Sequence, residues 1–136
     1  MRNVRNHRRL VALACAASLC ASGCAGSQDD AATTAALRLL DAAAAGDGVA
    51  ACAALAAPTR DELEQSSGKP CEEAVLEEEL GGGDGPASVE VFDTMAQVVV
   101  GAETVFLSRY DGRWRVVAAA CTPVPDRPYD CSIGLP

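Results

Sequence analysis

The chain has 136 residues, of which 19 are acidic and 11 are lysine or arginine, so its formal net charge is −8. This length accommodates one small domain. The negative charge disfavours binding to nucleic acid, because the phosphate backbone is recognised by basic surfaces. Histidine occurs once, at His7, which limits the catalytic chemistries open to the chain.

Residues 1–23 have the pattern of a cleaved export signal. Four arginines between residues 2 and 9 precede the apolar run "LVALACAASLCA". The run is too short to cross a bilayer as a helix, which takes roughly 20 residues, and the basic head and small-residue end are typical of signal peptides. Loss of this segment removes His7 and leaves 7 basic and 19 acidic residues, a net charge of 7 − 19 = −12. A histidine base and a Ser-His-Asp triad are therefore excluded from the exported domain.

The stretch Ala21-Ser22-Gly23-Cys24 resembles the lipobox of bacterial lipoproteins, in which small residues precede an invariant cysteine. The resemblance implies that Cys24 receives a diacylglycerol and becomes the N-terminus after cleavage. It also implies that the protein is held at the extracytoplasmic face of the cell membrane, with the lipid bilayer as a partner. One position departs from the pattern, because Ala21 stands where leucine is usual. Residues 24–29 are then expected to form a short tether, and the net negative charge predicts that the domain stands off anionic head groups.

Four helical segments are expected after the tether. Residues 30–45 carry apolar side chains at helical spacing, and residues 49–57 predict a second, short helix. Thr59 and Glu62 have capping-box spacing, which predicts that a third helix starts there. Pro70 stands at a first-turn position of the fourth helix, before two glutamates that the helix dipole favours.

Beyond residue 87 the pattern changes to strands separated by turn signals. Two-residue turns are expected at residues 93–94, 101–102 and 111–112, and the last of these is Asp-Gly, the strongest hairpin signal. These turns predict a four-stranded antiparallel meander. Their registers place apolar side chains on one face of the sheet. That face collects Val89, Val91, Ala96, Val98, Val100, Val105, Leu107, Trp114, Val116 and Ala118.

The opposite face is mixed, and we take it as the candidate interaction surface. A wholly solvated face would not be expected to carry several large apolar side chains. Arginines gather at the last hairpin, where Arg109 is expected to stack on Trp114. The candidate interaction residues are Phe92, Met95, Phe106, Tyr110, Arg113 and Arg115.

Four cysteines remain in the exported domain, and an even number in an exported chain predicts two disulfides. Four cysteines permit three connectivities, between which the sequence alone does not decide. We favour the local pair Cys52–Cys71, which joins two helical segments, and the local pair Cys121–Cys131, which holds a proline-rich tail at residues 122–136. A zinc site is disfavoured because the chain has no C-x-x-C pair, and no metal is expected.

Helices followed by a meander predict an α+β domain over residues 30–121, with its helices on one face of the sheet. The segments "ALAAPTRDEL" and "VFLSRYDGRWRVV" resemble small exported members of the NTF2-like (cystatin-like) superfamily, in which a strand, an Asp-Gly turn and a tryptophan recur. The resemblance implies a cone between the helices and the sheet. It also implies that enzymes of that superfamily work inside the cone with an acid and often a histidine.

Three functions compete for this pattern. We favour a non-catalytic interaction or dimerisation domain of the cell envelope, whose partner is a second copy or another envelope protein. The first alternative is a binding module for a small apolar ligand, which requires the alanine-rich helices to leave space above Trp114. The second is a histidine-free isomerase or dehydratase, for which Asp93, Glu103 and Tyr110 are the available groups. We expect no catalytic residues and no cofactor.

Overall fold

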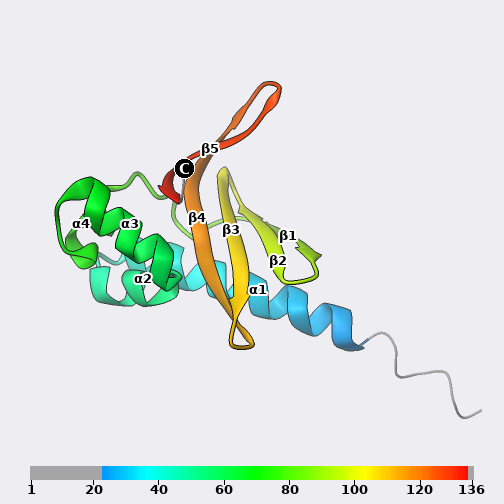
Figure 1. Cartoon of the computed structure of the whole chain (residues 1–136). Coiled ribbons are helices and arrows are strands. Elements are labelled where there is room, and N and C mark those ends of the chain that lie inside the picture. Colours follow the sequence, from blue (N-terminus) through cyan, green and yellow to red (C-terminus); the bar gives the residue numbers. More distant parts are fainter. Residues whose placement is uncertain (1–22, 135–136) are drawn as a thin grey trace, which may run out of the picture.

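The computed structural model describes residues 23–134 as four helices followed by five strands (Figure 1). The predicted α+β class is confirmed, although the sheet has five strands rather than four. Residues 1–22 of the expected signal peptide lie outside the described residues. Within the described range, no helix is long and apolar enough to cross a membrane. The elements are α1 (Gly23–Ala44), α2 (Gly48–Ala54), α3 (Ala57–Ser67), α4 (Cys71–Glu77), β1 (Ala87–Phe92), β2 (Met95–Val100), β3 (Glu103–Tyr110), β4 (Arg113–Val124) and β5 (Arg127–Gly134).

Helix α1 is longer than the sequence pattern predicted, because it begins at Gly23 instead of Asp30. Residues 24–29, expected as a tether, therefore form its first turns. No proline interrupts this part of the chain, and the alanine-rich sequence that follows has high helix propensity, so the helix extends backwards without a break. Its buried side packs against the sheet through residues at helical spacing. Those fully buried residues are Ala32, Ala36, Leu39 and Leu40.

The capping box predicted at Thr59 is wrong, because helix α3 already begins at Ala57. Pro58 occupies its first turn, where a backbone N–H has no partner within the helix and its loss is tolerated. The chain just before the helix is held by β4, since the Ala56 amide donates to the Val116 carbonyl over 2.8 Å. The Thr59 hydroxyl donates to the next carbonyl of β4 at 3.3 Å instead of capping the helix.

The five strands are antiparallel and follow the chain order β1-β2-β3-β4-β5. The registers predicted at the three turns are confirmed by the pairs Val91–Ala96, Val98–Val105 and Leu107–Val116. Asp93 and Asp111 adopt positive φ angles of 55° and 49° in their turns. This left-handed conformation is the one that two-residue hairpins require, and aspartate tolerates it better than most residues.

A bulge in β4 changes the predicted faces beyond Val116. Leu107 pairs with Val116 whereas Phe106 pairs with Ala118, so that β4 has one extra residue between these positions. Ala118 was expected on the apolar face, but the bulge shifts it to the other face, where it is half-buried. Ala119 takes its place in the core and is fully buried.

The expected C-terminal tail is a fifth strand, which corrects the prediction for residues 122–136. Strand β4 continues to Val124, and β5 pairs with it from Arg127 to Gly134 after a turn at Asp126. The prolines of this segment argued against a strand, because proline cannot donate to a sheet ladder. They are tolerated here because β5 is an edge strand and the end of β4 pairs with β5 alone.

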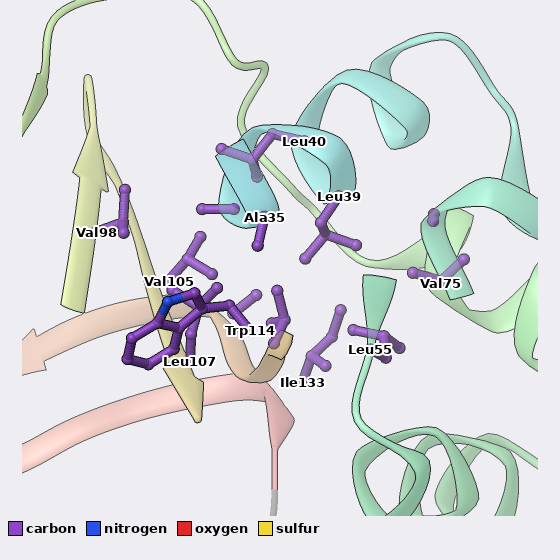
Figure 2. Close-up of a cluster of buried hydrophobic side chains, with 14 of the residues drawn as sticks. Ala35, Leu39, Leu40, Leu55, Val75, Val98, Val105, Leu107, Trp114 and Ile133 are labelled. Carbon is purple, nitrogen blue, oxygen red and sulfur yellow. The ribbon is translucent and has the colours of Figure 1, made fainter. Parts of the chain in front are cut away.

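The core lies between the helices and one face of the sheet. Figure 2 shows Trp114 close to Val105 and Leu107, with Leu39 of α1 and Ile133 nearby. Ile133 belongs to β5 and is fully buried. The fifth strand therefore supplies part of the core, a contribution that the four-stranded prediction lacked.

Both favoured disulfides are confirmed. The Cys52–Cys71 bond joins α2 to α4, and the Cys121–Cys131 bond joins β4 to β5. Cys121 and Cys131 are also direct partners in the sheet register. The second bond thus holds a hairpin rather than the tail that was expected.

Candidate functional site

The mixed face of the sheet is divided into a covered half and an open half. Over the covered half, the Tyr129 ring of β5 packs edge-on against Phe106, with ring centroids 5.1 Å apart. The Gln97 amide donates to the Tyr129 hydroxyl over 3.3 Å, and Thr104 is buried on the same face. Phe106 was expected to lie on an open interaction surface, but it is half-buried because the fifth strand supplies a ring that packs on it.

The open half carries three exposed large side chains. Phe92 is 61% exposed, Met95 is 51% exposed and Tyr110 is 42% exposed. A row of direct partners crosses four strands here. We call this row the open row, and it consists of Phe92, Met95, Ser108 and Arg115. Direct partners have Cβ atoms about 4.5–5.5 Å apart, so the open row is a continuous surface.

The arginines predicted at the last hairpin occupy different environments. The Arg109 guanidinium lies 5.9 Å from the centre of the Trp114 ring, as expected from the predicted stacking. Arg115 is half-buried, and its guanidinium donates to the Ala53 carbonyl at the end of α2. Arg113 is exposed and pairs with Tyr110 across the turn. Arg113 and Arg115 therefore edge the open half of the sheet.

An open groove of about 670 Å³ lies between α1 and the β3–β4 hairpin. The Trp114 indole N–H donates to the Gln28 side-chain oxygen over 3.2 Å, which holds the start of α1 against the hairpin. The small-ligand alternative requires space above Trp114, and the groove there is open and edged by arginines rather than enclosed and apolar. Its lining residues are Asp30, Ala31, Thr34, Ala35, Arg38, Gly112, Arg113, Trp114 and Arg115.

Arg38 is the arginine of this groove that sequence reasoning missed. It lies on α1, 75 positions before Arg113, and no local pattern connects the two. Its position in the helical register places it on the exposed side of α1. Only the packing of α1 across the hairpin brings it to the same groove as Arg113 and Arg115.

The three residues considered for a histidine-free enzyme do not form one site. Glu103 and Tyr110 stand at opposite ends of β3, about 23 Å apart at the usual rise per strand residue. The Glu103 carboxylate is buried and accepts hydrogen bonds from the Gly81 and Ala120 amides at 3.1 and 2.7 Å. It thus ties a loop to β4. Asp93 is a turn residue with positive φ.

Two acidic side chains at the end of helix α4 have partners elsewhere in the domain. Lys69 and Glu77 form an ion pair, and that hydrogen bond raises the pKa of the Lys69 ammonium. Burial raises the pKa of the Glu78 carboxyl, against an opposing hydrogen bond with Ser132 of β5. Among residues 23–134, no three histidine, cysteine, aspartate or glutamate side chains lie close enough together to hold a metal ion.

Comparisons of the chain with protein-family models, curated proteins and solved structures gave no match. The resemblance to the NTF2-like superfamily and to lipoproteins therefore remains a prediction.

Proposed function

We propose that the chain is an extracytoplasmic lipoprotein, anchored to the cell membrane through Cys24, whose domain is a non-catalytic interaction module. The lipobox pattern before Cys24 supports the anchor. The two disulfides support an oxidising compartment, since such bonds persist outside the cytosol. Neither disulfide uses Cys24. The NTF2-like resemblance supplies the family to which we assign the domain.

One observation carries the proposed interaction, namely the exposure of Phe92, Met95 and Tyr110 on one half of one face. Side chains of this size are rarely gathered on a free surface, because their exposure to water costs free energy that burial against a partner recovers. Arg113 and Arg115 edge this patch. An apolar centre with arginine at its margin is typical of protein interfaces. The partner is a second copy of the chain or another protein of the envelope.

Replacing Phe92 and Met95 by serine tests this surface. We expect the Phe92→Ser/Met95→Ser variant to lose association at least tenfold, while its free energy of unfolding changes by less than about 0.5 kcal/mol because both positions are exposed. Association is measured by sedimentation of the purified protein and by crosslinking in intact cells. The matched control is Val49→Ser, because Val49 is 72% exposed on α2, away from the sheet. If the double variant and the control give the same oligomeric state and the same crosslinks as the parent, the open row is not the interface.

Replacing Cys24 by alanine tests the anchor. We expect the Cys24→Ala variant to leave the detergent phase almost completely in a phase-separation assay, because a protein without its acyl chains has no apolar anchor. The control is Cys20→Ala, which changes a cysteine inside the expected signal and leaves the lipobox intact. Retention of Cys24→Ala in the membrane at the parent level would contradict lipidation at this residue.

A further inference from the structure

We propose that the groove between α1 and the β3–β4 hairpin binds a phosphate group, held by Arg38, Arg113 and Arg115. All three arginines line the groove, and we refer to it as the arginine groove. The groove and the open row share one residue, Arg115, and differ in all their other members.

The charge distribution favours an anion in the arginine groove. The chain from residue 24 onward has 7 basic residues against 19 acidic ones, yet three of those seven line this groove beside one carboxylate, Asp30. In the part of the chain that the structure describes, the ion pair present joins Lys69 to Glu77, and none of the three guanidinium groups is paired with a carboxylate. Such uncompensated guanidinium groups are the usual partners of phosphate and carboxylate ligands.

The geometry fixes the two sides of the groove before a ligand arrives. Arg38 lies on α1, whereas Arg113 and Arg115 lie on β4 on either side of Trp114, and all three line the groove. The hydrogen bond from the Trp114 indole to the Gln28 side chain holds α1 and β4 together. The hydrogen bond from Arg115 to the Ala53 carbonyl orders the Arg115 guanidinium. Groups that are already ordered lose less conformational freedom on binding, which increases the affinity.

The charge of the groove, the number of acceptor oxygens of the ligand and the groove volume favour a phosphate group over a simple carboxylate. Three arginines and one aspartate line the groove, which leaves a surplus of positive charge that suits a dianion. A phosphate group offers three or more acceptor oxygens, whereas a carboxylate offers two. The groove volume of about 670 Å³ lies within the range of about 300–1,000 Å³ typical of small-ligand sites. Ala31 and Ala35 leave room on the helical side for the organic part of the ligand.

The phosphate could belong to a lipid head group or to a soluble phosphate compound. Asp30 lies six positions after Cys24 in the same helix, so the two are separated by about 9 Å along the axis. Anchoring at Cys24 would bring lipid head groups close to the groove. Of the two sources, the lipid head group is the one that depends on the proposed function, because it requires the anchor. The net charge of the exported chain predicts repulsion from anionic head groups, but the three arginines reverse the sign of the charge locally.

Fluorescence of Trp114 reports binding directly, because it is the single tryptophan of the chain and lines the groove. The purified protein is titrated at constant ionic strength with inorganic phosphate, with glycerol 3-phosphate, and with phosphatidylcholine vesicles that contain or lack phosphatidylglycerol. We expect a saturable change in fluorescence. The Arg38→Gln/Arg113→Gln variant should bind at least tenfold more weakly. Arg60→Gln, an equivalent change on α3 outside the groove, should bind like the parent.

The arms of the titration separate the two sources. Saturation by inorganic phosphate or glycerol 3-phosphate, lost in the double variant, assigns the site to soluble phosphates. A response to phosphatidylglycerol vesicles alone assigns it to head groups. No saturable response in any arm, or equal responses from the parent and a folded Arg38→Gln/Arg113→Gln variant, overturns the proposal. The soluble arms do not depend on Cys24, so failure of the anchor and failure of the groove remain distinguishable.

Discussion

We expect the Cys52→Ala/Cys71→Ala variant to lose about 3 kcal/mol of unfolding free energy. The Cys52–Cys71 disulfide closes a loop between residues 19 positions apart, and this closure restricts the unfolded chain. Helices α2 and α4, which the bond joins, have seven residues each. Helices of that length are not stable on their own and depend on packing. Both sulfur atoms belong to buried residues of the core, so the substitution also removes packing. We therefore expect this bond to be the main support of the helical layer.

Urea unfolding followed by fluorescence of Trp114 measures the loss. The comparison is Cys121→Ala/Cys131→Ala, where the closed loop is shorter, with a separation of 10 residues. The same chain-entropy expression gives about 0.5 kcal/mol less for this second bond, and Ile133 remains in the core to hold β5. A loss below about 1 kcal/mol for the Cys52→Ala/Cys71→Ala variant would contradict the role assigned to the bond.

A second large loss of stability is expected when Gly48, the first residue of α2, is replaced by alanine. A Cβ atom at this position would lie 1.9 Å from the Glu72 carbonyl oxygen in α4. That oxygen is part of the backbone, so it cannot move aside as a side chain would. The two helices would have to separate, although the Cys52–Cys71 bond holds them together. We expect Gly48→Ala to lower the free energy of unfolding by about 3 kcal/mol, at the upper end of the usual cost of overpacking.

Gly26→Ala is the matched control for this substitution. Gly26 lies in α1, and, apart from its chain neighbours and the adjacent backbone of its own helix, no described heavy atom lies within 4 Å of the position that a Cβ would take. The control should therefore be neutral or stabilising by up to about 1 kcal/mol, through the better helix propensity of alanine. Thermal unfolding of both variants separates the effect of close packing from the effect of propensity. Equal melting temperatures for Gly48→Ala and the parent would show that α2 and α4 can separate without cost.

The parts of the fold that could be predicted are those governed by short-range chemistry. The turns at residues 93–94, 101–102 and 111–112 depend on residues that accept positive φ, and their registers follow directly. The two local disulfides were favoured because each joins cysteines that are close in sequence, although the sequence alone left three connectivities open. The placement of Phe92, Met95 and Tyr110 on one face of the sheet follows from strand alternation, and the structure leaves these three side chains exposed.

The parts that could not be predicted depend on contacts between distant segments. Strand β5 contains Pro128, which weakens the strand signal, and its tolerance of this proline depends on its place at the edge of the sheet. The bulge near Val116 has no sequence mark, yet it moves Ala118 to the other face. Arg38 joins the arginine groove through the packing of α1 across β4, a contact that helical periodicity does not encode.

The start of α1 at Gly23 has a mechanical consequence for an anchored protein. Six extended residues would act as a leash of about 20 Å and let the domain swivel freely. The same residues in a helix rise only about 9 Å and transmit rotation, because a helix is a stiff rod. The hydrogen bond from the Trp114 indole to the Gln28 side chain holds the start of α1 against the sheet. The domain could then not rotate independently of an anchor at Cys24. The membrane would therefore determine the direction in which Phe92, Met95 and Tyr110 face.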